Sequence, residues 1–183
     1  MSKQVLHPLT ELVINELEAL YLAYAEPLYY YLLKISGTHY IAEELVQETF
    51  YRATLSLDLY ENEQVKSWLY KVARNAYMDE WRKRQRWKWV PFLEQMTGLN
   101  ELHSPYGVPE EEVMAKQVKE EVEDIMKLLP EQYRSILYLR EQQQFSYEEL
   151  GETLELSPEQ VKVTIHRARK RFKQHAERLG KNF

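Results

Sequence analysis

Residues 65–86 read VKSWLYKVARNAYMDEWRKRQR, and the spacing of their apolar side chains gives the first structural prediction. Apolar residues recur at i, i+3 and i+4, the period of one buried helix face: Val65, Trp68, Leu69, Val72, Ala73 and Ala76. The other face is basic, because residues 66–88 hold eight basic and two acidic side chains. Asn75, Tyr77 and Trp81 lie among these charges. A basic helix with aromatic residues suits single-stranded nucleic acid, but a solvated helix whose aromatic residues belong to the core explains the pattern equally well.

Length and composition describe one medium domain or two small ones. The 183 residues are 44% hydrophobic and 29% charged, as in an ordinary globular protein. No apolar run approaches the ~20 residues of a membrane-spanning helix, and the first residues lack the apolar core of a signal peptide. The absence of cysteine excludes disulfides and fits a reducing compartment, and the five histidines have no metal-ligand spacing. We therefore expect a cytoplasmic protein without direct membrane insertion, metal or cofactor.

The net charge of −5 conceals an alternating pattern. Residues 1–64 hold three basic and ten acidic side chains, and residues 101–131 hold three and nine. Residues 158–183 hold eight basic and two acidic side chains, so a second basic segment follows the one at 66–88. Two basic segments separated by acidic ones indicate two nucleic-acid contacts on one chain, with acidic surfaces left for another partner.

Helical periodicity also precedes residues 65–86. We expect a helix over 10–36, kinked or restarted at Pro27 and ended by Gly37. A second helix is expected over 40–57. With residues 65–86 these segments predict a small three-helix bundle.

After this bundle the periodicity stops. Between about 86 and 109, prolines, glycines and mixed polar residues predict a flexible linker. Pro109 and Pro130 each predict the start of a further helix. The predicted fold class is therefore all-α, with two small helical domains joined by the linker.

An acidic face is expected on the helix over 40–57, where it carries Glu44, Gln47 and Glu48. Glu44 and Glu48 lie one turn apart and could hold a divalent metal, as in a nuclease, but no third ligand is evident nearby. A solvated or protein-binding face explains them better. On the basic helix, Asp79 lies one turn before Lys83, and an i,i+4 ion pair is expected there.

Two capped helices separated by a short turn are predicted near the C-terminus. Ser146 and Glu149 match the capping box of the first helix. Ser157 matches the cap of the second, with Pro158 at its first position and Gln160 at its third. Two helices joined in this way predict a helix-turn-helix.

The second of these helices has a core face and a polar face. Val161, Ile165, Ala168 and Phe172 recur at helical spacing and should be buried. The polar face holds Gln160, Lys162, Thr164, His166, Arg167, Lys170 and Arg171. Its first members could reach base edges in the major groove, and the later basic residues suit phosphates. The alternative is a solvated charged face, but the paired caps and the positive charge favour DNA binding.

Three stretches together resemble bacterial RNA polymerase sigma factors of the extracytoplasmic-function type. They are AEELVQETFYRA (42–53), the 65–86 stretch, and LPEQYRSILYLREQQQFSYEELGETLELSPEQVKVTIHRARKRF (129–172). Members of this family have only sigma domains two and four. The resemblance therefore implies a region 2 domain over 1–87, a linker over 88–112 and a region 4 domain over 113–183.

The resemblance also implies a role for each surface. The core-polymerase set, where the family contacts the largest polymerase subunit, is Glu44, Gln47 and Glu48. The −10 set, where the family reads the −10 element and captures an unpaired base, is Lys71, Arg74, Asn75, Tyr77, Trp81, Arg82, Lys83 and Arg86. The −35 set, which reads upstream duplex, is Gln160, Lys162, Thr164, His166, Arg167, Lys170 and Arg171. Basic groups with stacking aromatic residues are suited to holding an opened strand.

The implied function is promoter-specific transcription initiation by a protein that is not itself an enzyme and uses no metal or cofactor. Its implied partners are core RNA polymerase and promoter DNA. Many members are held inactive by an anti-sigma protein, and the sequence leaves open whether one binds this chain. Trp87 and Trp89 match no family signature and are candidates for a regulator-binding surface. The alternative function is a stand-alone helix-turn-helix regulator with an N-terminal dimerisation bundle.

Overall fold

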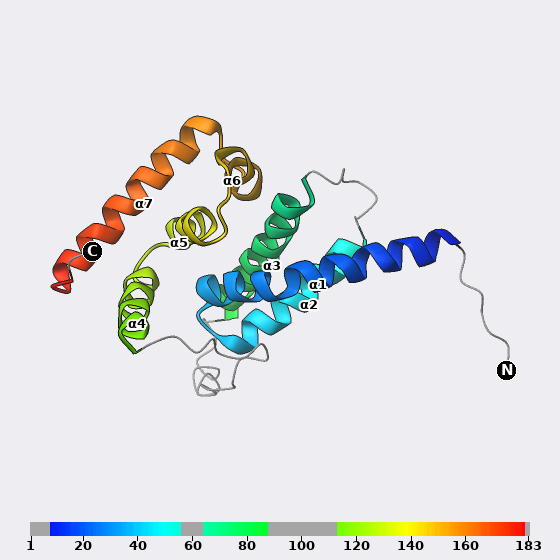
Figure 1. Cartoon of the computed structure of the whole chain (residues 1–183), viewed down its shortest axis with the longest axis horizontal. Coiled ribbons are helices and arrows are strands. Elements are labelled where there is room, and N and C mark those ends of the chain that lie inside the picture. The colour runs from blue at the N-terminus through cyan, green and yellow to red at the C-terminus, as the bar shows by residue number, and fades with distance from the viewer. Residues whose placement is uncertain (1–7, 56–63, 88–112, 182–183) are drawn as a thin grey trace.

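The structure is a computed structural model that describes residues 8–55, 64–87 and 113–181. Helices α1 (Pro8–Ser36), α2 (His39–Thr54) and α3 (Val65–Trp87) come first. They are followed by α4 (Val113–Lys127), α5 (Glu131–Leu137), the π-helical turn η4 (Tyr138–Gln142), α6 (Tyr147–Leu154) and α7 (Pro158–Arg178) (Figure 1). The predicted linker, Trp89 and the predicted helix start at Pro109 lie outside the described residues.

The ends of the first two helices follow their capping residues. Helix α1 runs without a break through Pro27, and Gly37 ends it in the left-handed conformation, with φ 79°. The Thr38 hydroxyl oxygen then accepts a hydrogen bond from the Ile41 N–H and caps α2. The predicted end of α1 is confirmed, and its continuity through Pro27 removes the predicted alternative of a second helix starting there.

The first bundle forms around the apolar face of α3. Trp68, Leu69, Ala73 and Ala76 are buried, with Val65 and Val72 half-buried, so the face predicted from the spacing is confirmed. Helices α1, α2 and α3 contact one another in this bundle. The core is completed by apolar residues of α1 and α2, including Leu28, Leu32, Leu45 and Phe50.

The second bundle packs α4, α5 and α6 against α7. Ser146 with Glu149 and Ser157 with Gln160 each form a complete capping box, and Pro158 is the first residue of α7, as predicted. Along α7, Val161, Ile165 and Ala168 are buried and Phe172 is half-buried against the core. The helix-turn-helix read from the sequence is therefore present.

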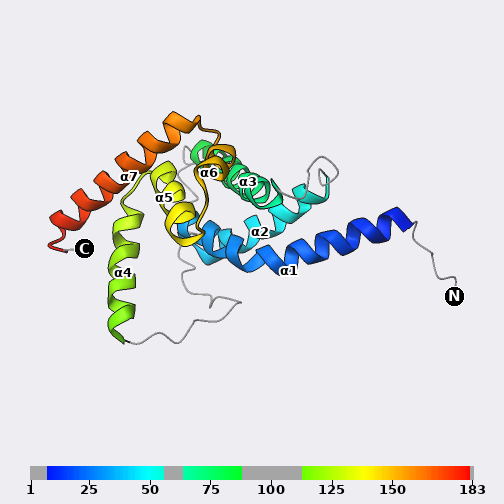
Figure 2. The ribbon, with the colours of Figure 1, turned by 45° about the horizontal axis from the view of Figure 1, so that its top comes forward.

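The two bundles lie directly against each other. Helix α6 packs on α3, and α5 and η4 pack on α1, as both views show (Figures 1 and 2). An aromatic cluster fills the contact, with ring centroids of Tyr31 and Tyr70 5.3 Å apart and those of Tyr70 and Phe145 5.0 Å apart. Burial raises the pKa of Tyr138, at the edge of this cluster, to about 12. The buried apolar residues of the two bundles thus form one continuous cluster.

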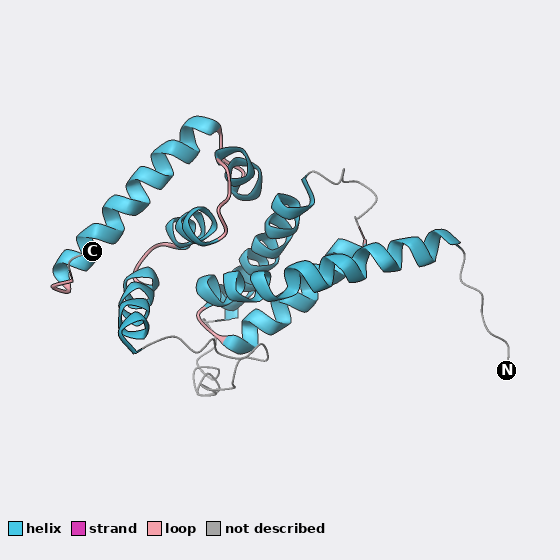
Figure 3. Cartoon of the chain, in the orientation of Figure 1, coloured by secondary structure: helices cyan, strands magenta, loops and turns pink. Residues whose placement is uncertain are grey.

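Every regular element in the described ranges is a helix, which confirms the all-α prediction (Figure 3). Helices α1 to α3 fall within the predicted first domain and α4 to α7 within the predicted second domain. None of the described helices is both long and apolar enough to span a membrane. The sequence predicted the two helical units but not the contact between them.

The cap of α7 provides a test of the local structure. Replacing Ser157 by Ala removes the acceptor for the Gln160 N–H, and we expect the free energy of unfolding to fall by about 1 kcal/mol. Ser157→Asp keeps an acceptor at the same place and should retain most of the stability. Urea unfolding followed by circular dichroism measures both, and equal stability of the Ala variant and the unmodified chain would contradict the assignment.

Candidate nucleic-acid interface

Helix α7 presents most of the predicted −35 set to solvent. Lys162, His166, Arg167, Lys170 and Arg171 are exposed on the side opposite its buried face, and Thr164 is half-buried. Gln160 is also exposed, but its amide oxygen accepts the Ser157 N–H at 2.8 Å in the capping box. Its amide nitrogen is the group that remains for a base or a phosphate.

The basic charges of this surface are largely uncompensated. Among the residues that the structure describes, Lys162, Arg167, Lys170 and Arg171 form no ion pair. Arg169 differs, because its guanidinium lies 2.6 Å from the Glu141 carboxylate. Unpaired cations along one side of a helix attract a polyanion strongly, because binding releases the counterions of the phosphates.

The predicted −10 set divides into two groups along α3. Asn75, Trp81, Arg82 and Lys83 are exposed, and the side chain of Arg86 lies outside the described residues. Asp79 pairs with Arg82 at 3.0 Å and with Arg52 of α2 at 2.9 Å. The predicted pair of Asp79 with Lys83 is therefore wrong, because two arginine side chains occupy its carboxylate.

The second group, Lys71, Arg74 and Tyr77, faces the second bundle. Arg74 donates two hydrogen bonds to the Glu131 carboxylate, at 3.0 and 3.1 Å. Burial lowers the pKa of Arg74, but the hydrogen bond and the charge of Glu131 outweigh it and leave the pKa raised. Lys71 Nζ lies 3.1 Å from Glu155 Oε1, and Tyr77 is only 9% exposed. Arg74 and Tyr77 are covered in this arrangement, whereas the side chain of Lys71 is paired with Glu155 but remains 31% exposed.

The core-polymerase set lies on an exposed face of α2. Glu44 and Gln47 are exposed, and the Tyr40 hydroxyl donates to Glu44. Glu48 is half-buried and accepts a hydrogen bond from Arg52 at 2.7 Å. Exposed Tyr40, Tyr51 and Leu55 border the same face, so it offers apolar as well as acidic contacts to a protein. The described residues contain no group of three or more side chains suited to hold a metal ion.

The carboxylates that pair with α3 were not predicted from the sequence. Glu131 of α5, Glu149 and Glu152 of α6 and Glu155 after α6 all reach this helix. A signal was present for Glu149, Glu152 and Glu155, because residues 141–157 hold five glutamates and no basic residue. Such a run is complementary in charge to residues 66–88, the most basic internal segment of the chain.

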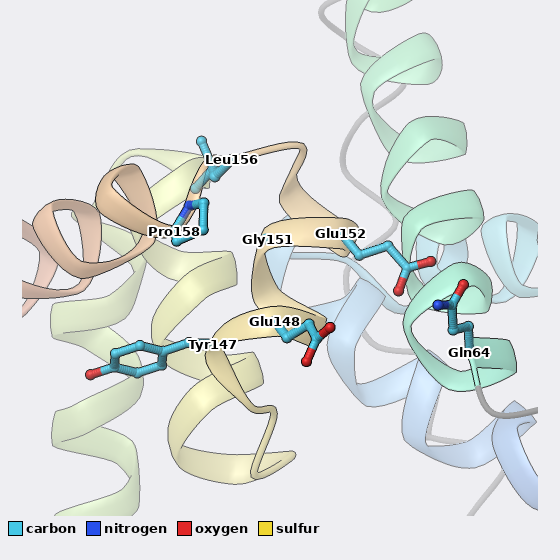
Figure 4. Close-up of a pocket in the computed structure, with 7 residues that line it drawn as sticks. All are labelled: Gln64, Tyr147, Glu148, Gly151, Glu152, Leu156 and Pro158. Atoms are coloured by element: carbon cyan, nitrogen blue, oxygen red, sulfur yellow. The ribbon is translucent and has the colours of Figure 1, made fainter.

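A shallow pocket lies beside this contact, between α6, the turn of the helix-turn-helix and the start of α3 (Figure 4). Its walls include the carboxylates of Glu148 and Glu152 and no basic side chain. Glu152 extends from α6 toward Gln64, at the start of α3 (Figure 4). Acidic walls repel phosphates, so this pocket is not part of a nucleic-acid surface.

Comparisons with known proteins match both bundles. Residues 20–87 match the family Sigma-70 region 2, and residues 119–172 match the family Sigma-70, region 4. The ECF RNA polymerase sigma factor SigM of Bacillus subtilis is 39% identical over 70 residues, which are 38% of this chain and 43% of SigM. The ECF RNA polymerase sigma factor SigW of the same organism is 27% identical over 112 residues, or 58% of this chain and 60% of SigW. The chain thus spans about half the length of these curated relatives.

A solved structure shows the same fold. The sigma factor RpoE of Bartonella quintana, crystallised in complex with the anti-sigma factor NepR, superposes with a TM-score of 0.67 at 23% identity. The match covers 88% of this chain and 97% of that one. The arrangement of helices is therefore shared, although most side chains differ.

The exposed basic residues of α7 provide a matched test. Lys170→Ala removes an unpaired cation, so we expect weaker binding to duplex DNA of any sequence and a slope of log K against log salt that is smaller by about 1. Arg169→Ala removes a guanidinium already held by Glu141, and its effect on the slope should be smaller. Fluorescence anisotropy over a series of salt concentrations measures both slopes. Equal changes for the two variants would contradict this view of the α7 surface.

Proposed function

We propose that the chain, whose two bundles match Sigma-70 region 2 and Sigma-70, region 4, is an RNA polymerase sigma factor of the extracytoplasmic-function type and directs core RNA polymerase to specific promoters. One observation carries the proposal: a single chain bears an unpaired basic face on a recognition helix and a separate basic helix with exposed Asn75 and Trp81. Two DNA-binding surfaces of this kind suit a duplex element and an opened strand.

Helix α7 is proposed to bind the upstream −35 duplex. In a helix-turn-helix the start of the second helix reaches base edges, and Lys162, Thr164, His166 and Arg167 lie in the first three turns of α7. Lys170 and Arg171 lie one turn further along and suit phosphate contacts. The exposure of this face supports the assignment.

Helix α3 is proposed to hold the strand that is opened at the −10 element. An unpaired base can be captured by hydrogen bonds to its edge and by stacking, and Asn75 and Trp81 supply one exposed group for each. Arg82 and Lys83 add positive charge toward the C-terminal half of the helix. Binding the single strand favours opening, because it stabilises the product of melting.

Core polymerase is proposed to bind the face of α2 that carries Glu44, Gln47 and Glu48. The exposure of Glu44 and Gln47, with Tyr51 and Leu55 beside them, supports this surface for a protein partner. We further propose that the chain acts in the cytoplasm as residues 1–87 and 113–183 joined by a linker over 88–112. The polymerase forms the phosphodiester bonds, so the chain needs no bond-making residues or cofactor.

An anti-sigma protein is proposed as a third class of partner. The support is the similarity in fold to RpoE of Bartonella quintana, which was solved with the anti-sigma factor NepR. The stand-alone regulator remains the competing function, but no described feature favours it. It differs from the proposed function in needing no polymerase for its activity.

Run-off transcription with purified core polymerase tests the proposal directly. We expect the chain to give a discrete transcript from promoters selected by the reconstituted holoenzyme, and none from scrambled −35 or −10 elements. Core polymerase alone is the control. Tight duplex binding by the free chain, with no transcript beyond that of core polymerase, would instead establish the stand-alone regulator.

Asn75→Ala separates DNA opening from polymerase binding. The loss of one base contact should weaken opening by about 1–3 kcal/mol, because a polar base edge loses its partner. Permanganate reactivity of unpaired thymines reports opening, and gel filtration with core polymerase reports assembly. Gln85→Ala, which removes an exposed amide elsewhere on α3, is the matched control and should change neither. Loss of polymerase binding in Asn75→Ala would overturn the division of surfaces.

A further inference from the structure

The outward face of α7 has an apolar residue at its centre. Val161, Ile165 and Ala168 define the buried face of this helix. Val163 follows Val161 by two residues and precedes Ile165 by two, so it lies about 160° around the helix axis from each of them, opposite the core. Its side chain is 45% exposed, and it belongs to none of the surfaces assigned above.

Basic and polar side chains surround Val163 on this face. Lys162 precedes it, His166 and Arg167 lie one turn further along, and Lys170 lies two turns further along. All four are exposed. Residues three, four and seven apart share one side of a helix, so His166, Arg167 and Lys170 lie on the same side as Val163. When the cations of this face draw α7 toward DNA, Val163 therefore faces the duplex.

The position of Val163 along α7 places it near the bases. Pro158 is the first residue of α7, so Val163 lies in the second turn. In a helix-turn-helix the N-terminal residues of the second helix contact base edges in the major groove. Glu159, one turn before Val163 on the same side, is exposed and carries a carboxylate. Neither a carboxylate nor an isopropyl group binds a phosphate, so the centre of this face is suited to base contacts over its first two turns.

An aliphatic side chain can recognise only one group in the major groove. Val163 offers two methyl groups and no hydrogen-bond donor or acceptor. Thymine is the base that presents a methyl group in this groove, at C5. The polar edges of the other bases would lose water against Val163 without gaining a partner, which costs free energy. Val163 therefore favours thymine by apolar contact and disfavours the other bases by desolvation.

The helix holds Val163 in a fixed place. Val161 and Ile165, two residues to either side, are 0% and 3% exposed, so the backbone at position 163 is anchored to the core. A valine in a helix has one strongly preferred side-chain rotamer. Contact with a base thus immobilises little that is still free to move, and the cost in conformational entropy is small.

We propose that Val163 is a specificity-determining residue of the −35 surface: it packs against the C5 methyl group of a thymine in the major groove and so selects a T·A base pair at one position of the −35 element. This inference rests on the proposed function, because it assigns a base preference to the proposed −35 surface. Lys170 and Arg171 supply phosphate contacts that do not depend on sequence, whereas Val163 discriminates between bases.

Deoxyuridine tests this contact, because it lacks only the C5 methyl group of thymidine and pairs with adenine in the same way. The −35 element is first selected from random duplexes by the holoenzyme reconstituted from the full chain and core polymerase. Each thymine of the selected element, on either strand, is then replaced in turn by deoxyuridine. Competition with the labelled parent promoter measures how strongly the holoenzyme binds each duplex.

Two variants of α7 are compared with the unmodified chain. Val163→Ala removes the proposed contact and keeps the helix, because alanine favours helix more than valine does. Leu179→Ala is the matched control, since Leu179 is an apolar residue of similar exposure, 48%, at the opposite end of α7. Circular dichroism confirms that both variants fold.

We expect one thymine whose replacement weakens binding by the unmodified holoenzyme about fourfold, the effect of losing one buried methyl group. Val163→Ala should weaken binding to the parent promoter and make this replacement nearly silent, while its response to the other replacements stays unchanged. Leu179→Ala should respond like the unmodified chain. The absence of such a thymine, or an equal deoxyuridine effect in the Val163→Ala holoenzyme, would overturn the proposal.

Failure of the proposed function gives a different result. In that case the holoenzyme selects no −35 element and gives no transcript beyond that of core polymerase, and the free chain selects a duplex site instead. The deoxyuridine series on that site, with the same two variants, still decides whether Val163 contacts a thymine methyl group.

Discussion

The ion pair between Arg74 and Glu131 constrains how the two helical bundles of this chain can sit relative to each other. It joins α3 to α5 by two hydrogen bonds, and the two side chains are only 13% and 18% exposed. Breaking a fully buried pair by removing one partner costs about 3–5 kcal/mol, and a partly exposed pair costs less. If the Arg74–Glu131 pair is broken, the Arg74 guanidinium must therefore be hydrated or bind another anion.

This ion pair and the contacts around it decide which surfaces of the two bundles are covered and which stay exposed. The aromatic contact of Tyr31, Tyr70, Tyr138 and Phe145 stabilises the packing of the two bundles without regard to charge, while glutamates of the second bundle pair with the basic side chains of α3. The faces of α2 and α7 stay open, so partner binding there does not require prior separation.

The sequence predicted the local structure well, because its signals are local. The apolar period of residues 65–86 identified Trp68, Leu69 and Ala73 as core, and the two capping boxes identified the helix-turn-helix. It did not predict that Tyr77 is covered or that Arg74 is paired, because their partners lie far along the chain. Arg74 and Glu131 are 57 residues apart in the sequence. The apolar periodicity of α3 therefore contains no information on their pairing. Only the run of glutamates over 141–157 hinted at a complementary surface.

Single-molecule energy transfer between dyes on the two domains tests the central claim most directly. The dyes are placed on Leu22→Cys in α1 and Lys173→Cys in α7, which are exposed positions in a chain that otherwise lacks cysteine. The free chain should show one population of constant transfer efficiency, because the buried contact of α3 with α5 and α6 fixes the two bundles relative to each other. A free chain that samples a broad range of efficiencies would contradict a fixed contact between the two bundles.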